Sequence, residues 1–212
     1  MALRSDGPRL RRFRLGALAG LALLAPVGPR ALAHDMHGMQ MDDEPEGSRP
    51  VRSTREYAVP DVRLVRQDGK AVSLRQEMDD GRPVVLNFIY TTCTDICPLM
   101  SSVLEQFQRR LGAEAGKVHL MSISIDPEQD TPARLAEYAR RFHAGPGWQH
   151  YTGTLDASIA AQRAFGVYLG TKSAHSVVTL VRAAPGKPWL RIDGIVKPDE
   201  LVHDYRDLIA GG

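Results

Sequence analysis

The two cysteines, Cys93 and Cys97, are the residues whose type and spacing point most directly to chemistry. They lie in TTCTDICPLM (residues 91–100), with three residues between them and Pro98 after them. Two thiols so placed can close a disulfide, exchange electrons with other thiols or hold a soft metal ion. A purely structural disulfide is the least attractive of the three, because the entropic benefit of a cross-link is small when the loop is short.

A strand and a helix must position these thiols. The apolar run PVVLNFIY (83–90) predicts a strand buried on both faces, which ends three residues before Cys93. Cys97 lies where a helix is predicted to begin, and Pro98 suits that position. Backbone N–H groups and the helix dipole favour negative charge there, so at least one cysteine should have a lowered pKa. The helix itself is predicted by apolar residues at steps of three and four: Leu99, Val103, Leu104, Phe107 and Leu111.

The rest of the chain predicts strands that alternate with helices. The Asp68-Gly69 turn joins two short segments into a hairpin. This order indicates an α/β protein with a thioredoxin-like fold and an added N-terminal β-hairpin. Ligands in such sheets collect at the carboxyl ends of the strands, where the cysteines lie. The predicted elements are strands at 62–66, 71–74, 83–90, 119–125, 176–182 and 189–194, and helices that begin near 98, 132, 157 and 199.

His175 is the histidine best placed to join the thiols. It stands directly before the strand at 176–182, in the loop that faces the cysteine loop in a thioredoxin-like fold. Cu(I) favours thiolates, and one imidazole would turn a two-thiolate site into a three-coordinate one. A closed zinc site would need four ligands, and the chain has no second cysteine pair. Cys93, Cys97 and His175 are therefore the candidate metal ligands.

The other titratable residues near the predicted strands carry weaker signals. Asp126 ends a strand at the same edge and could touch the site, yet turn formation and helix capping explain Asp126 and Asp130 at least as well. The remaining histidines of the domain are expected to pack or to face solvent. Their expected places are the start of a strand for His119, helices for His143 and His203, and a loop for His150.

The same cysteine pair also supports a redox hypothesis. Cys93 and Cys97 would then be the catalytic residues of a thiol–disulfide oxidoreductase, which works through a mixed disulfide formed by the cysteine of lower pKa. Their three-residue spacer is wider than the two-residue spacer usual in oxidoreductases of the thioredoxin type. The residues alone leave open whether the protein is an enzyme or a metal carrier.

Residues 1–33 are predicted to be an export signal peptide. They combine an arginine-rich start, an apolar run of ~13 residues and the small-residue cleavage site Ala31-Leu32-Ala33. The run is shorter than the ~20 residues of a membrane-spanning helix, so an uncleaved membrane anchor, with the domain facing the periplasm, is the alternative. Both Sec and twin-arginine export remain open, since Arg11-Arg12 is present. We expect a periplasmic location, where a disulfide can persist.

Removal of this signal would change the sign of the net charge. It leaves 21 of the 27 basic residues and 24 of the 25 acidic ones, so the charge passes from +2 to about −3. A basic surface that could serve as a nucleic-acid footprint is therefore not supported.

Residues 34–56 are predicted to be a flexible tail and linker, because they contain almost no apolar residue except methionine. The domain proper would then span 57–212. We expect the tail to act as an accessory copper-capturing segment, since imidazoles and thioethers are soft or borderline donors. If cleavage falls after Ala33, the new terminal amine beside an imidazole could also chelate Cu(II). The donors are His34, Met36, His37, Met39 and Met41.

Three segments in the right order give the chain a family resemblance. NFIYTTCTDICPLM, SISIDPEQDTPARLAEYARRF and AHSVVTLVRAAPGKPWLRIDG resemble the Sco/SenC family of copper-handling, thioredoxin-like proteins, over about residues 57–210. The resemblance implies copper bound by Cys93, Cys97 and His175, and a role in building the dinuclear copper centre of cytochrome c oxidase. Thr94 stands where the family commonly has proline. Ala174 stands where it commonly has an aspartate that could orient the imidazole.

The function expected on these grounds is that of a periplasmic copper chaperone or metallation factor. It would deliver Cu(I), Cu(II) or both to cytochrome c oxidase or another exported cuproprotein. Its partners would be that client, such as an oxidase subunit, together with a copper donor or a thiol reductant. The alternative is an oxidoreductase that keeps the copper-ligating cysteines of a partner reduced.

Overall fold

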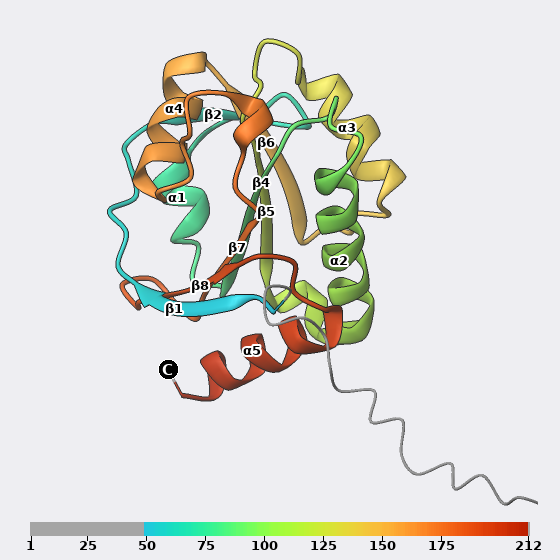
Figure 1. Ribbon diagram of the computed structural model, residues 1–212, viewed down its shortest axis with the longest axis vertical. Helices are drawn as coiled ribbons and strands as arrows, with labels where there is room; N and C mark the ends of the chain where they lie inside the picture. The colour runs from blue at the N-terminus through green and yellow to red at the C-terminus, as the bar shows by residue number, and fades with distance from the viewer. Residues whose placement is uncertain (1–48, 212) are drawn as a thin grey trace, which may run out of the picture. The chain divides into compact units, whose positions relative to one another are not determined.

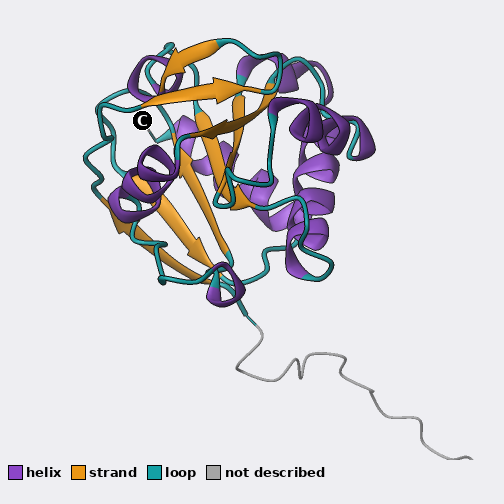
Figure 2. Cartoon of the chain, turned by 90° about the horizontal axis from the view of Figure 1, so that it is seen from above, coloured by secondary structure: helices purple, strands orange, loops and turns teal. Residues whose placement is uncertain are grey.

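The computed structural model describes residues 49–211, in which eight strands form one sheet (Figures 1 and 2). The strand order is β1-β8-β7-β4-β5-β6-β2-β3. No helix in this part of the chain is long and apolar enough to cross a membrane. The strands are β1 (Val51–Arg55), β2 (Arg63–Arg66), β3 (Ala71–Ser73), β4 (Val84–Ile89), β5 (His119–Ser124), β6 (Trp148–Gly153), β7 (Val178–Arg182) and β8 (Trp189–Asp193).

Helices cover both faces of the sheet, with α2 and α3 on one side and α1 and α4 on the other (Figure 1). Strand β4 shows why its sequence is apolar throughout: Val85 and Ile89 pack under α2, α3 and α5, whereas Leu86 and Phe88 face the opposite core. The helices are α1 (Leu74–Met78), α2 (Ile96–Leu111), α3 (Pro132–Arg141), α4 (Leu155–Ala164) and α5 (Pro198–Ala210), with short 3-10 turns η1 (Gly112–Lys117) and η2 (Lys172–Ala174).

Strand pairing brings three loops to one edge of the sheet. β4 and β5 are parallel, with Ile89 beside Ser124, so the loops that leave these strands lie next to each other. β7 runs antiparallel to β4, with Thr179 beside Asn87, so the loop that enters β7 reaches the same edge. The first two loops carry the cysteines and Asp126, and the third carries His175. The predicted α/β order and the hairpin, here β2 and β3, are confirmed.

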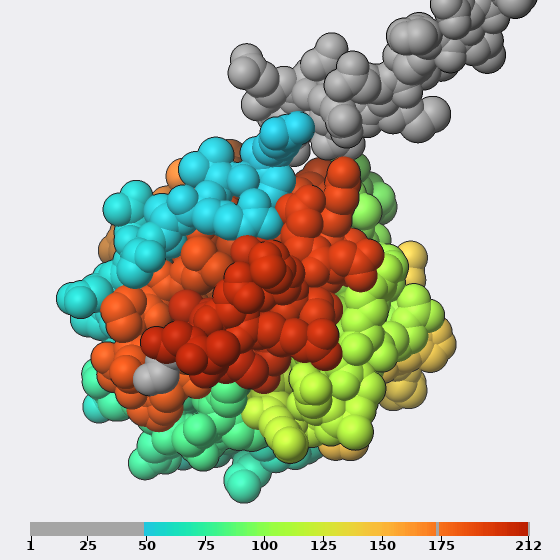
Figure 3. All heavy atoms as spheres, turned by 90° about the horizontal axis from the view of Figure 1, so that it is seen from below, coloured from blue at the N-terminus to red at the C-terminus, as the bar shows by residue number. Residues whose placement is uncertain are grey.

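Strand β1 lies inside the segment 34–56, for which the sequence predicts a tail and linker. It pairs antiparallel with β8, and Arg52 bonds the carboxylates of Asp204 and Glu200 on α5 at 2.9 Å each. Figure 3 shows this strand beside α5 on one face of the molecule. VRSTR has no apolar pattern, because an edge strand exposed along most of its length needs none. The predicted signal, and the tail up to residue 48, lie outside the described residues.

Strand β6 is a second element that the sequence pattern does not predict. The prediction of a loop at His150 is wrong, because this residue lies fully buried in the strand, with its ring stacked on Trp148 at 5.2 Å between centroids. The segment WQHYTG has too many polar residues to show the apolar pattern of a buried strand. It is nevertheless a strand, because β5 and β2 pair with it on both sides. The prediction of a helix at His143 is wrong as well: it lies beyond the end of α3, at a φ of 50°.

Candidate metal and thiol site

The cysteine loop connects β4 to α2 and brings the two thiols together at the start of the helix. Both cysteines are free thiols and buried, Cys97 at 1% exposure and Cys93 at 9%. The backbone N–H of Cys97 donates to Cys93 Sγ at 3.4 Å, and the N–H of Cys93 donates to the carbonyl of Tyr90 at 3.2 Å. Asp95, the residue before α2, makes no side-chain cap, so the helix N–H groups are left to the thiol.

The two thiols differ in acidity. Burial raises the pKa of Cys93, but hydrogen bonds from the backbone of Cys97 and Asp95 and from the side chains of Cys97 and Tyr90 outweigh it, so the net pKa is lowered. Burial is the largest influence on Cys97 and, with the neighbouring Cys93 and Asp130, raises its pKa to about 12. The lowered pKa expected of one cysteine therefore falls on Cys93, which makes it the better nucleophile of the two at neutral pH.

Tyr90 links the thiol to the imidazole, a role that sequence reasoning missed. Its hydrogen bond to Cys93, followed by burial, raises the pKa of the phenol to about 12, so Tyr90 stays a donor at neutral pH. Its ring meets the ring of His175 edge-on, with centroids 5.9 Å apart. The only sequence signal for this role was the position of Tyr90 at the end of a buried strand, close to the cysteines. That signal was not specific, because an aromatic residue at the end of an apolar strand is equally typical of core packing.

His175 lies half-buried at the site edge, where its Nε2 is 3.0 Å from the carbonyl oxygen of Phe88. A carbonyl only accepts, so Nε2 carries the proton and Nδ1 keeps the lone pair that a metal needs. Burial lowers the pKa of the ring, which favours the neutral form. Within residues 49–211, no three His, Cys, Asp or Glu side chains lie close enough together to hold a metal. The three candidate ligands thus share one edge but are not gathered into a cluster.

Lys172 and Asp126 tie the His175 loop to the exit of β5. Lys172 Nζ lies 2.6 Å from Asp126 Oδ2, whose side chain is only 8% exposed. The same ammonium lies 5.9 Å from the centroid of the Tyr90 ring. Asp126 is therefore not only a turn residue, since its carboxylate anchors the loop that carries His175. Ala174 is exposed and has no charge to offer at the position where the family commonly has aspartate. The charged contact of this loop comes from Lys172 instead, through its ion pair with Asp126.

Replacing Lys172 with methionine should loosen the His175 loop. The variant keeps the length of the side chain but removes the charge that pairs with Asp126, so amides of residues 170–175 should exchange with solvent several-fold faster. Hydrogen exchange read by mass spectrometry measures this. Lys172→Arg, which retains the charge, is the matched control. Equal exchange in Lys172→Met and the parent would contradict the anchoring role.

Asp130 holds the start of the cysteine loop. It is fully buried and accepts hydrogen bonds from the backbone N–H of Thr91 at 3.2 Å, from Thr91 Oγ1 at 2.5 Å and from Ser124 Oγ at 2.5 Å. The cap of α3 is supplied by Thr131 instead, whose side chain accepts from the backbone N–H of Arg134. The capping interpretation of Asp130 is therefore wrong, and its carboxylate fixes the backbone two residues before Cys93.

The other histidines take structural or exposed places. Burial lowers the pKa of His150 to about 3, and His119 Nε2 lies 2.9 Å from the Tyr151 hydroxyl, so both belong to the packed interior. His143 and His203 are exposed, each beside a carboxylate. The tail donors His34, Met36, His37, Met39 and Met41 lie outside the described residues.

Comparison with known proteins places this arrangement in a family. The SCO1/SenC family model matches residues 52–209. A Bacillus subtilis protein named SCO1 protein homolog is 33% identical over 114 residues, which are 53% of this chain and 58% of that protein. The matched part thus spans little more than half of that relative.

Solved structures extend the likeness to about three quarters of the chain. Bradyrhizobium japonicum ScoI with copper bound is 27% identical, at a TM-score of 0.60, and the match covers 71% of this chain and 99% of that one. BsSco, described as a member of the Sco family of cytochrome c oxidase assembly proteins with a disulfide switch, is 25% identical, at a TM-score of 0.63, over 76% of this chain and 98% of that one. Both support the thioredoxin-like fold. The chain belongs to the SCO1/SenC family.

Proposed function

We propose that this protein is an exported copper chaperone that holds copper at Cys93, Cys97 and His175 and passes it to a client. The observation that carries the proposal is the pair of thiols at the start of α2, one of them with a lowered pKa, at the edge where the loop of His175 arrives. The related ScoI, whose structure has copper bound, supports copper as the metal. Thiolate donors with one imidazole suit Cu(I).

Loading would require two changes at the site. The thiol proton of Cys97 must leave, because a metal binds the thiolate, and burial makes this proton the harder one to remove. The loop of His175 must also move, because the imidazole does not yet join the thiols. Nδ1 would face copper while Nε2–H keeps the Phe88 carbonyl as its partner, an arrangement typical of metal-bound histidines.

The client would be the dinuclear copper centre of cytochrome c oxidase or another exported cuproprotein. The description of BsSco as an oxidase assembly protein supports this class of client. In the periplasm, the donors of the 34–41 tail would collect copper from a copper donor and hand it to the thiols. Transfer would proceed by ligand exchange, since thiols on the client compete with the thiols of the chaperone.

A second function, thiol–disulfide exchange with the client, is favoured by the difference between the two cysteines. The Cys93 thiolate would attack a client disulfide, form a mixed disulfide and release one client thiolate. The Cys97 thiolate would then attack Cys93 Sγ and release the second. Two electrons pass to the client and a Cys93–Cys97 disulfide remains, which a thiol reductant would then reduce back to the two thiols. The lowered pKa of Cys93 and its contact with Cys97 suit this sequence.

Cu(I) titration of the reduced protein beginning at residue 34, in competition with a chromophoric chelator, tests the copper site. We expect Cys93→Ser and Cys97→Ser to abolish tight binding. His175→Ala should weaken it by more than the ~10–100-fold typical of residues that merely support a ligand. The exposed His203 supplies the matched control, since His203→Ala should change nothing.

Two results would decide against the chaperone site. Full affinity in the three site variants, with loss only on deletion of residues 34–41, would place the copper in the tail. Rapid reduction of a disulfide peptide that survives His175→Ala, without tight copper binding, would favour the oxidoreductase.

A further inference from the structure

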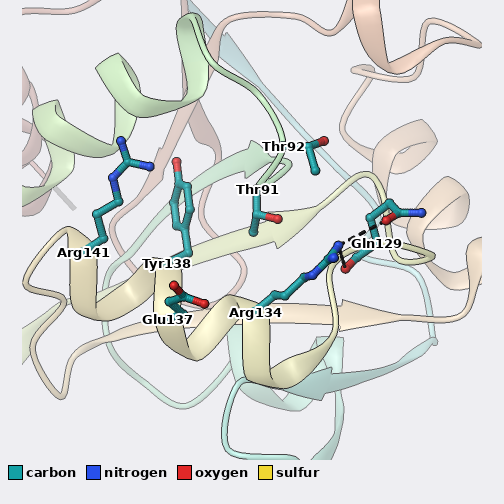
Figure 4. Close-up of a pocket in the computed structure, with 7 residues that line it drawn as sticks. All are labelled: Thr91, Thr92, Gln129, Arg134, Glu137, Tyr138 and Arg141. Atoms are coloured by element: carbon teal, nitrogen blue, oxygen red, sulfur yellow. Dashed lines mark hydrogen bonds between the residues drawn. The ribbon is translucent and has the colours of Figure 1, made fainter.

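A groove of about 530 Å³ lies directly beside the cysteine loop (Figure 4). One wall is formed by Thr91 and Thr92, the two residues before Cys93. Thr91 is fixed from behind by the buried carboxylate of Asp130, so this wall is firmly held. The other wall comes from α3 and the loop before it, through Gln129, Arg134, Glu137, Tyr138 and Arg141.

Two arginines, Arg134 and Arg141, lie at the sides of the groove (Figure 4). Arg134 Nη1 donates to the backbone and side-chain oxygens of Gln129, at 2.9 and 3.1 Å, which orients its guanidinium. The guanidinium of Arg141 lies 5.5 Å from the centroid of the Phe142 ring. Within residues 49–211, neither arginine forms an ion pair with a carboxylate. Both have N–H donors to spare, and guanidinium groups prefer carboxylates.

Glu137 lies between the two arginines, so the charges along this wall alternate as plus, minus, plus (Figure 4). Arg141 follows Arg134 by seven positions along the helix, a rise of about 10 Å. An extended chain advances about 3.3 Å per residue, so acidic residues two to four positions apart match this separation. Glu137 repels a third acidic residue and favours a basic or neutral one between them.

We propose that the groove docks an extended segment of the client protein in which two acidic residues flank a basic or neutral residue. A segment bound here lies against Thr92, which brings the client beside Cys93. The inference rests on the proposed function only in taking the partner at Cys93 to be a protein.

The test titrates the metal-free, reduced protein with two end-blocked peptides, EGKGE and its charge inverse KGEGK, and follows backbone amides by NMR. EGKGE should shift the amides of Thr91 and Thr92 with a Kd on the order of millimolar, and KGEGK should not. Arg134→Gln with Arg141→Gln should weaken EGKGE binding roughly tenfold. Arg140→Gln is the matched control, because Arg140 is exposed on the same helix but does not line the groove.

A charge-swapped variant guards against indirect effects. R134E, E137K and R141E together should reverse the preference, so that KGEGK binds and EGKGE does not. Equal binding of both peptides to the parent, or a loss in Arg140→Gln as large as in the double variant, would overturn the proposal. Since no copper is present, this outcome is independent of whether Cys93, Cys97 and His175 bind copper.

Discussion

At neutral pH, iodoacetamide should modify Cys93 at least about 100-fold faster than Cys97. Hydrogen bonds from the start of α2 and from Tyr90 lower the pKa of Cys93, whereas burial raises that of Cys97 to about 12. A larger thiolate fraction outweighs the weaker intrinsic nucleophilicity of a more acidic thiol. Because the pKa of Cys93 lies below its ordinary value, its modification should reach half-maximal rate at a lower pH than that of a free thiol. Peptide mass spectrometry after timed quenching measures both rates.

Single-cysteine variants separate the effect of burial on each thiol pKa from the effect of the neighbouring cysteine. In Cys93→Ser, Cys97 should stay slow, because burial is the first cause of its raised pKa and remains in the variant. In Cys97→Ser, Cys93 should stay fast, because the backbone N–H of residue 97 still faces its sulfur. Comparable rates for the two cysteines of the parent would refute the assigned roles of nucleophile and buried partner.

Asp130→Ala should lower the free energy of unfolding by about 3 kcal/mol. The substitution leaves the backbone N–H and hydroxyl of Thr91 and the buried hydroxyl of Ser124 without the acceptor that the buried carboxylate supplies. Buried donors that lose a charged acceptor cost more than ordinary hydrogen bonds. Urea unfolding of the reduced protein gives the value.

The conservative variant distinguishes a lost acceptor from a general defect. Asp130→Asn keeps one oxygen of the same shape, so it should cost less than half as much as the alanine. Asp156→Ala, in the exposed first turn of α4, is the control and should stay within about 0.5 kcal/mol of the parent. A stability of Asp130→Ala equal to that of the control would show that the cysteine loop does not depend on this carboxylate.

Sequence patterns were sufficient to predict an element where a single physical requirement, the burial of apolar side chains, determined its structure. The apolar run of β4 has to be buried on both faces, and the steps of three and four after Pro98 permit only a helix with an apolar face. A strand followed by a helix then puts Cys93 and Cys97 at a helix start, where a thiolate is stabilised. This local part of the candidate site was predictable, and the structure confirms the placement.

Patterns failed where neighbours supplied the stabilisation. β1 has no apolar alternation and is ordered by its pairing with β8 and by ion pairs to α5. β6 reads as a polar segment, yet β5 and β2 enclose it and bury His150. The roles of Asp126 and Asp130 were also hidden, because an aspartate after a strand looks the same whether it caps a helix or anchors a distant loop. The signal and the methionine-rich tail stay predictions.

Residue types and spacing alone predict two thiols at a helix start, at the edge of a central α/β sheet, with one histidine entering from an opposite loop. Hydrophobic periodicity and short spacing are local properties of the chain, so they can be recognised without knowing the fold. The packed fold is needed to recognise Cys93 as the more acidic thiol and Tyr90 as the residue between it and His175. The same holds for the anchoring of the His175 loop by Lys172 and Asp126 and for the arginine-flanked groove beside the thiols. Acidity, anchoring and grooves depend on burial and on partners distant in sequence, which the fold alone brings together.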